Sequence, residues 1–122
     1  MLKDSFFSIT DVVDSEYDRT CCIALNHLHP IFQAHFAGHP IMPGACVVQL
    51  IKELTADYLD RSFFVSKVKN MKFLHVINPL ESPEITVKMT FTRLENDCIS
   101  VATTIYRNDK AFSKSTLILI EQ

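Results

Sequence analysis

Residues 35–44, HFAGHPIMPG, form the stretch that most limits how this chain can fold. They contain both glycines of the chain and two of its five prolines. The next fifteen residues, ACVVQLIKELTADYL, contain neither, and their large apolar side chains recur at helical spacing. Pro43 suits the first turn of a helix, since its missing N–H costs nothing there and its φ is already helical. The pattern predicts a sharp turn into one long helix, from near residue 43 to near Leu59.

Strand patterns lie on both sides of this helix. Residues 6–13 and 19–25 are rich in aromatic and β-branched residues and are separated by the polar DSEYD, which predicts a hairpin. After the helix, clusters of turn-forming residues separate four more stretches. These stretches, which we expect to form an antiparallel run, are residues 63–77, 83–94, 98–107 and 111–121.

Two of these stretches show which face of the sheet is buried. In residues 83–94 apolar side chains alternate with polar ones, and residues 98–107 repeat the pattern, so one face should be apolar. That face needs a cover, and the chain has one long apolar helix to offer. The expected fold class is α+β, a curved antiparallel sheet wrapped around one long central helix. With no linker or internal repeat, residues 1–122 should form a single domain.

Composition argues against several classes of function. Hydrophobic residues make up 48% and charged residues 21% of the chain, as in globular proteins. The formal net charge of −2 leaves no positive excess to neutralise a phosphate backbone, so no nucleic-acid partner is expected. The start, MLKDSFFSIT, has no secretory apolar segment, and no run of 18 apolar residues occurs. We expect a soluble cytoplasmic protein without membrane insertion.

The cysteines and two of the histidines are candidate metal-binding or disulfide-forming residues. One adjacent cysteine pair and two isolated cysteines resemble neither a disulfide framework nor paired zinc ligands, so buried free thiols are expected. His27 and His29 lie two residues apart, yet no nearby carboxylate or cysteine completes a ligand set. We therefore expect no metal and no cofactor. The cysteines are Cys21, Cys22, Cys46 and Cys98.

The turn before the helix contains candidate catalytic groups. Gly44 would lie in the first helical turn, where N–H groups lack partners and a carbonyl oxygen that gains negative charge could be held. The alternative is a tight loop that enters a helix. His35 could remove a proton at neutral pH, whereas His39, between Gly38 and Pro40, is better suited to shaping the loop. For both histidines a structural role is the alternative.

A polar pair lies further along the predicted helix. Gln49 and Glu53 are one turn apart and share a stripe with the small residues Ala45 and Ala56. A stripe of small residues can accept a neighbour or a ligand, and the alternative is a solvated helix face. Because apolar residues surround Gln49, we expect it to be buried and to need hydrogen-bond partners.

These residues resemble a known family. HFAGHPIMPG is similar to the HFPGHPIMPG signature of the β-hydroxyacyl-acyl-carrier-protein dehydratases of fatty-acid synthesis, with Ala37 in place of proline. The similarity extends upstream through HPIFQAHF and more weakly through residues 65–89 and the last two strands. It implies a hot-dog fold and a homodimer whose sheets join, with a higher oligomer or a heterodimer as alternatives. It also places the active sites at the interface, with an acyl tunnel between the subunits.

The resemblance implies dehydration of a 3-hydroxyacyl thioester, carried by acyl-carrier protein or CoA, to the trans-2-enoyl form in fatty-acid or related lipid or polyene synthesis. His35 matches the catalytic histidine, and Gly44 matches the glycine whose N–H polarises the thioester carbonyl. Gln49 stands where the family has a catalytic Glu or Asp, so the usual order Glu-x-x-x-Gln is reversed as Gln49-x-x-x-Glu53. The signature residues expected along the substrate are Phe36, Gly38, His39, Pro43 and Ala45.

This reversal leaves several functions open, because a glutamine amide does not readily supply the proton that a departing hydroxyl needs. Glu53 could take over, about 6 Å further along the helix and through a shifted substrate or a water. His35 could serve both steps, or catalysis could be lost. The alternatives are a non-catalytic hot-dog subunit that binds acyl-carrier protein or completes a heterodimer and, less favoured by the signature, an acyl thioesterase.

A basic cluster follows the helix. Because acyl-carrier proteins are acidic, this cluster is the candidate contact with a carrier, and ordinary mixed surface charge is the alternative. The cluster consists of Arg61, Lys67, Lys69 and Lys72.

Overall fold

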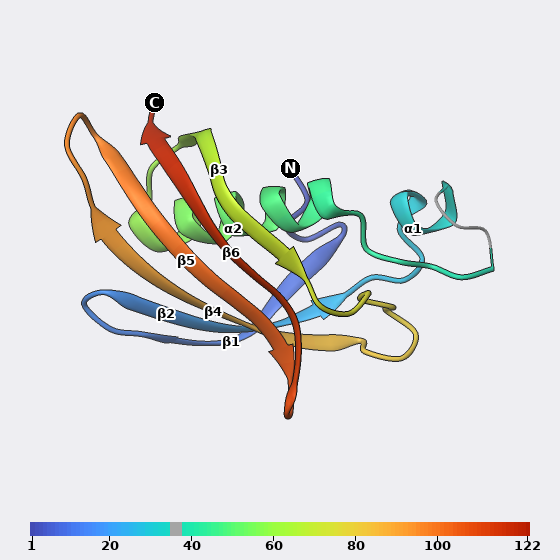
Figure 1. Cartoon of the computed structure of the whole chain (residues 1–122). Helices are drawn as coiled ribbons and strands as arrows, with labels where there is room; N and C mark the ends of the chain where they lie inside the picture. The colour runs from blue at the N-terminus through green and yellow to red at the C-terminus, as the bar shows by residue number, and fades with distance from the viewer. Residues whose placement is uncertain (35–37) are drawn as a thin grey trace.

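The computed structural model describes residues 1–34 and 38–122, which form one curved antiparallel sheet around a long helix (Figure 1). The strand order in the six-stranded sheet of the described residues is β1-β2-β4-β5-β6-β3. Helix α2 (Gly44–Leu59) lies on the concave side of this sheet. The arrangement is the α+β hot-dog fold that was expected. The strands are β1 (Phe7–Asp14), β2 (Asp18–Leu25), β3 (Phe63–Phe73), β4 (Glu84–Arg93), β5 (Cys98–Arg107) and β6 (Lys110–Glu121).

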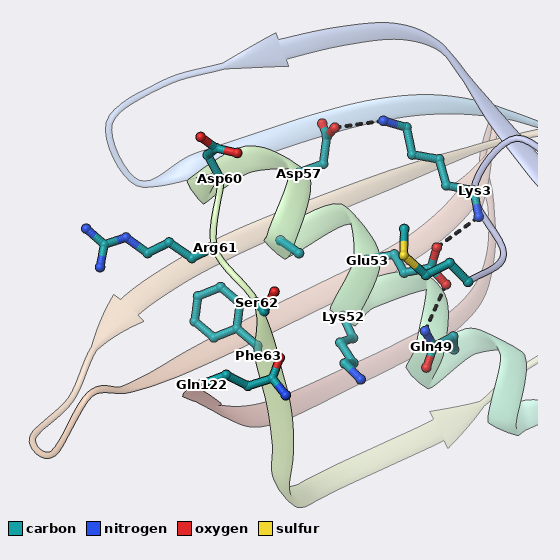
Figure 2. A pocket seen from close by; sticks show the side chains of 12 residues that line it. Lys3, Gln49, Lys52, Glu53, Asp57, Asp60, Arg61, Ser62, Phe63 and Gln122 are labelled. Carbon is teal, nitrogen blue, oxygen red and sulfur yellow. Dashed lines mark hydrogen bonds and ion pairs between the residues drawn. The ribbon is translucent and has the colours of Figure 1, made fainter.

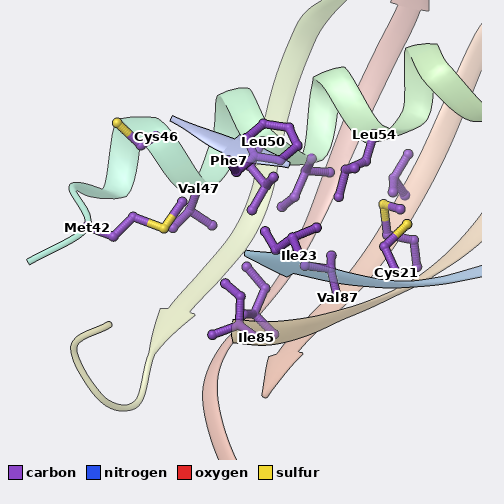
Figure 3. Packing of buried hydrophobic residues seen from close by; sticks show 14 of the residues in the cluster. Phe7, Cys21, Ile23, Met42, Cys46, Val47, Leu50, Leu54, Ile85 and Val87 are labelled. Carbon is purple, nitrogen blue, oxygen red and sulfur yellow. The ribbon is translucent and has the colours of Figure 1, made fainter. Parts of the chain in front are cut away.

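The core lies between α2 and the concave face of the sheet. Leu50 and Leu54 on the helix are fully buried and point toward strand residues that include Ile23 and Val87 (Figure 3). The apolar residues that alternate along β4 and β5 are buried, so the predicted apolar face is confirmed. The sheet needs one cover, and the apolar side of α2 provides it.

The strand β3 forms one edge of the sheet and is irregular. Among the described strands it pairs only with β6, and register shifts occur between Val65 and Lys67 and between Val68 and Asn70. Each shift is a β-bulge that adds one residue and so changes which side chains face the core. Val65 and Val68 therefore lie opposite the buried Leu119 and Leu117, although they are three positions apart in sequence.

Residues 74–77 do not continue this strand, so the predicted strand over 63–77 is four residues too long. The N–H groups of Leu74 and His75 both donate to the Phe112 carbonyl oxygen, at 2.8 and 3.2 Å, and this convergence ends the regular ladder. The Met42 N–H then donates to the Ile77 carbonyl oxygen at 2.9 Å. This bond ties the segment after β3 to the segment that enters α2.

The helices, the cysteines and the absence of a membrane-spanning helix among the described residues can also be compared with the sequence predictions. The hairpin and the long helix are confirmed, while the short helix α1 (Pro30–Ala34) was not predicted. All four cysteines are free, but only Cys21 and Cys46 are buried; Cys22 and Cys98 are half-buried, so the expectation was wrong for these two. Over the described ranges, no helix has the length and apolar character needed to cross a membrane.

Candidate active site

The start of α2 presents unpaired backbone donors. Pro43 precedes the helix with extended backbone angles (φ −64°, ψ 148°), and no side chain of the described part of the chain caps this end. The Pro43 carbonyl oxygen accepts bonds from Cys46 and Val47 at 2.9 and 3.3 Å. The N–H groups of Gly44 and Ala45 have no partner among the described residues. They lie at the positive end of the helix, where an oxygen that gains negative charge would be stabilised.

An aromatic ring covers this helix start. A Cβ atom added to Gly44 would lie 3.0 Å from Cζ of Phe73, the last residue of β3. Glycine therefore has a packing reason here in addition to any role toward a ligand. Phe73 keeps an exposed fraction of 57%, so the ring covers the helix start from the solvent side.

The ring belongs to a pocket of about 220 Å³ beside Gly44. Its lining is mostly apolar, and the His75 side chain, whose Nδ1 lies 3.1 Å from the Ala111 carbonyl oxygen, is the titratable group in it. An apolar chain with a carbonyl group at one end would match this combination of an apolar wall and free N–H donors. The lining residues are Ile41, Met42, Gly44, Val47, Phe73, Leu74, His75, Val76, Ile77 and Phe112.

Gln49 and Glu53 are directly bonded one turn apart on α2 (Figure 2). The half-buried Gln49 donates from Nε2 to Glu53 Oε2 at 2.9 Å. The buried Glu53 also accepts two bonds from the Leu2 N–H, at 2.9 and 2.7 Å, and one from the Lys3 N–H at 2.8 Å. The Glu53 carboxylate thus holds the N-terminal segment, which no sequence pattern indicated.

A hollow of about 420 Å³ lies beside this pair, between α2, the N-terminal segment, the start of β3 and the end of the chain (Figure 2). Gln49 and Glu53 line it, whereas Gly44 lines the smaller pocket. Their neighbours in the larger hollow include both positively and negatively charged side chains. The other lining residues are Met1, Lys3, Lys52, Ala56, Asp57, Asp60, Arg61, Ser62, Phe63 and Gln122.

A charged cluster fixes the middle of α2 to the first hairpin. The buried Arg19 donates from Nη1 to the Leu54 carbonyl oxygen at 2.9 Å and lies 2.7 Å from Asp57 Oδ2. Its Nε lies 3.1 Å from Asp14 Oδ1, close enough for an ion pair but without hydrogen-bond geometry. The hydrogen bond and charge of Lys3, supported by Arg19, lower the pKa of Asp57, and the same bond raises the pKa of Lys3.

The other predicted substrate contacts are only partly brought together. His35 and Phe36 lie outside the described residues. Gly38 has a positive φ of 83°, is exposed and lines a separate pocket that contains Pro40 but not Gly44. His39 is exposed as well. The remaining two, Pro43 and Ala45, flank Gly44 at the helix start.

The predicted basic cluster divides into two parts. Arg61 forms an ion pair with Glu121, while the three lysines are exposed along β3. Lys67 and Lys72 lie opposite Ile118 and Lys114, on the convex face of the sheet. Lys69 lies in the second bulge of β3.

Across residues 1–34 and 38–122, no group of three or more His, Cys, Asp or Glu side chains is placed to hold a metal ion. Phe73 was predicted only as a strand residue, since the sequence does not show which ring meets Gly44 across about thirty residues of chain.

Comparison with known proteins identifies the family of this chain. A model of the ApeI-like family, described as ApeI dehydratase, matches residues 12–114. The 3-hydroxyacyl-[acyl-carrier-protein] dehydratase FabZ of Latilactobacillus sakei is 33% identical over 75% of this chain and 69% of its own length. The FabZ of Geotalea uraniireducens is 30% identical over 72% of this chain and 68% of its own.

Solved structures show the same fold. The dehydratase heterocomplex ApeI:P from Xenorhabdus doucetiae has a TM-score of 0.73 at 14% identity, covering 92% of this chain and 96% of that one. A probable thioesterase from Bartonella henselae has a TM-score of 0.63 at 10% identity, covering 88% and 91%. These two structures show that one fold accompanies different described activities, so the family rests on the sequence matches. The chain belongs to the ApeI-like dehydratase family, whose members share the hot-dog fold and are related to FabZ.

Proposed function

We propose that this chain dehydrates 3-hydroxyacyl thioesters, carried by acyl-carrier protein or CoA, to trans-2-enoyl thioesters in fatty-acid, lipid or polyene synthesis. The observation that carries the proposal is the Gly44 N–H at the start of α2, which has no partner among the described residues and lies beside an apolar pocket of about 220 Å³. In a family of dehydratases, this pairing of a donor with an apolar wall suits a thioester carbonyl and its acyl chain.

The proposed reaction removes a proton from C2 and the hydroxyl group from C3. His35 takes the C2 proton while the Gly44 N–H stabilises the negative charge on the carbonyl oxygen. The electron pair of the C2–H bond then forms the C2–C3 double bond, and the C3–O bond breaks. The His35 imidazolium gives its proton to the leaving hydroxyl, so that water departs and the histidine returns to its neutral form. This route needs no carboxylic acid, because His35 serves as both base and acid. It also fits the engagement of Glu53, which is already bonded to Leu2, Lys3 and Gln49.

The proposal includes a homodimer in which the sheets join at β3. One edge of β3 pairs with β6, and the other edge pairs with no strand of the described residues. Phe64, Val68 and Phe73 on this strand have exposed fractions between 46% and 57%. Such large apolar side chains along a free edge suit contact with a second copy. The exposed lysines of β3, Lys67, Lys69 and Lys72, are the proposed contact for an acidic carrier.

Gly44→Ala tests the proposed donor. The added methyl group would meet the Phe73 ring and crowd the pocket beside the N–H, so we expect kcat/KM for a 3-hydroxyacyl thioester to fall by about 10- to 100-fold. Alanine is favoured over glycine in a helix by about 1 kcal/mol, and the contact with Phe73 offsets this gain, so stability should change little.

The double variant Gly44→Ala/Phe73→Leu separates packing from catalysis. A shorter side chain at position 73 relieves the contact with the new methyl group. Turnover that stays low in the double variant, compared with Phe73→Leu alone, supports a catalytic Gly44. If turnover returns with the relief of the contact, Gly44 serves packing only.

A second candidate is a non-catalytic subunit that binds an acyl-carrier protein or completes a heterodimer. Gln49 and the engagement of Glu53 favour it, since neither offers a carboxyl group free for acid chemistry. A solved heterocomplex with the same fold also supports it. A folded protein without turnover by itself, but with turnover after addition of a second hot-dog subunit, would favour this candidate.

A further inference from the structure

We infer that the side-chain oxygen of Gln49 is a fixed hydrogen-bond acceptor for the 3-hydroxyl group of the substrate, and that Glu53 is the positioning residue that fixes it. The inference rests on the proposed function and assigns a role to the pair that departs from the family order. It follows from the hydrogen bonds of the two residues, from their burial and from their place on α2.

The contacts of Glu53 all come from donors. Its carboxylate accepts from the backbone N–H groups of Leu2 and Lys3 and from Gln49 Nε2, at distances of 2.7 to 2.9 Å. The exposed fraction of Glu53 is 6%, so water has little access to compete for these bonds. Two backbone N–H groups cannot change their direction as a side chain could, and they hold the carboxylate in place.

A carboxylate held in this way determines the orientation of the Gln49 amide. The amide has donors on Nε2 and acceptors on Oε1, and only the Nε2 side can bond to Glu53. A flip would place two acceptors against each other and lose the 2.9 Å bond. The oxygen of Gln49 is therefore directed away from Glu53 (Figure 2).

The Gln49 oxygen is the unused end of this network. No described residue donates to it, and Gln49 lines the hollow of about 420 Å³. A half-buried amide oxygen can accept a bond from a hydroxyl group, but it has no proton to give. This chemistry matches an alcohol and does not match a carboxylate or a carbonyl group.

The place of Gln49 on α2 suits a hydroxyl group near the thioester. Gln49 lies five residues after Gly44, a rise of about 7.5 Å along the helix axis. Long helical side chains lean toward the N-terminus, which shortens the distance to Gly44. Gly44 and Gln49 line separate hollows, so the inference requires a substrate whose carbonyl group binds at the Gly44 N–H while its 3-hydroxyl group reaches Gln49. The pair would thus distinguish hydroxyacyl from saturated acyl chains.

The test compares the binding of two pantetheine amides, a 3-hydroxyacyl form and a saturated form of equal chain length, by calorimetry. An amide in place of the thioester leaves the C2 proton too weakly acidic for turnover, so equilibrium binding is measured. We expect wild type to bind the hydroxyacyl form about 5- to 10-fold more tightly, as one hydrogen bond gives. Gln49→Leu should bring the ratio of the two Kd values close to one.

Glu53→Gln tests the positioning step, since an amide at position 53 can donate or accept and no longer selects one orientation of Gln49. We expect a smaller Kd ratio than in wild type and a changed NMR signal of the Gln49 side-chain NH₂ group. Lys52→Gln is the matched control, because Lys52 lines the same hollow and bonds to no described residue. It should keep the wild-type ratio.

The outcomes separate the inference from the proposed function. If both amides bind to wild type and Gln49→Leu leaves their Kd ratio unchanged, the inference is overturned and the proposed function stands. If neither amide binds to folded wild-type protein, the proposed function fails and the inference fails with it. A ratio lost in Gln49→Leu and reduced in Glu53→Gln, but kept in Lys52→Gln, supports both.

Discussion

Asp57 joins three segments of the chain that lie far apart in sequence. Its carboxylate bonds to Lys3 Nζ at 2.9 Å through one oxygen and lies 2.7 Å from Arg19 Nη1 through the other. Arg19 in turn donates to the Leu54 carbonyl oxygen within α2. A single side chain thus ties the N-terminal segment, the first hairpin and the central helix together, next to the Glu53 network.

Asp57→Asn should make the free energy of unfolding less dependent on pH in the acidic range. The pKa of Asp57 is lowered in the folded protein, chiefly by the hydrogen bond from Lys3, so its contribution is present above the unfolded pKa of about 4. The contribution is lost as pH falls through the lower, folded pKa. The side chain is 29% exposed, so we expect about 1 kcal/mol or less at pH 7, shrinking toward zero near pH 3.

Urea unfolding of wild type and variant at pH 7 and pH 3 measures this change. Asp60→Asn is the control, because the Asp60 side chain bonds to no described residue and asparagine accepts its left-handed backbone. A difference between wild type and Asp57→Asn that stays equal at both pH values would contradict the assignment.

Helix α2 is the element that places the candidate site, and its two ends differ. Within residues 1–34 and 38–122, its start has no side-chain cap and two N–H groups without partners, which suits a ligand better than it suits stability. Its end is closed by Asp60, whose N–H donates to the Ala56 carbonyl oxygen from a left-handed conformation (φ 53°, ψ 47°). Glycine adopts that conformation without strain.

Asp60→Gly should raise the free energy of unfolding by roughly 0.5–1 kcal/mol, because glycine removes the strain of a side chain at positive φ. Asp60→Ala should lower it by up to about 1 kcal/mol, since the left-handed backbone conformation costs alanine more than it costs aspartate. Thermal and chemical unfolding give both values. Changes of the same sign in the two variants would show that backbone conformation does not decide stability at this position.

The elements could be predicted from sequence to the extent that their patterns are local. The spacing of apolar residues and Pro43 indicated α2 to within one residue at its start, and alternation indicated the buried face of β4. The end of β3 was missed because two N–H groups meet one carbonyl oxygen of β6, which depends on packing. The bulges of β3 were missed for the same reason, since apolar residues three apart do not follow strand alternation.

The candidate site was less predictable, because its contacts join distant segments. The sequence indicated Gly44 from its helix-start context and the polar pair from its helical spacing. It did not indicate that Glu53 accepts bonds from Leu2 and Lys3, because backbone N–H groups carry no residue-specific signal. Nor did it indicate Phe73 over Gly44. These contacts change the roles that the Glu53 carboxylate and the Gln49 amide can have.

At the scale of the whole molecule, the proposed sites need two subunits joined at β3. Val68→Asp should convert the dimer into a monomer, since Val68 faces the concave side of the free-edge strand and a buried charge there costs free energy. Light scattering after size-exclusion chromatography measures the mass against 13.9 kDa for one chain. Turnover should fall with the loss of the dimer.

Lys67→Glu is the matched variant on the opposite face of the same strand. It should keep the dimer and weaken turnover of carrier-bound substrate while sparing a small thioester. A dimer that persists in Val68→Asp would place the subunit contact elsewhere, and equal losses on both substrates in Lys67→Glu would argue against a carrier contact.

The most direct test of dehydration is the absorbance of the enoyl thioester when the purified protein is mixed with a 3-hydroxyacyl carrier substrate. With wild type and the 3-hydroxyacyl substrate, we expect the absorbance to rise toward its equilibrium value. With the enoyl substrate, we expect it to fall toward the same value as the reverse reaction proceeds. His35→Ala should abolish both changes while the protein stays folded. A folded wild-type protein that leaves substrates of several chain lengths unchanged would contradict dehydration by this chain alone.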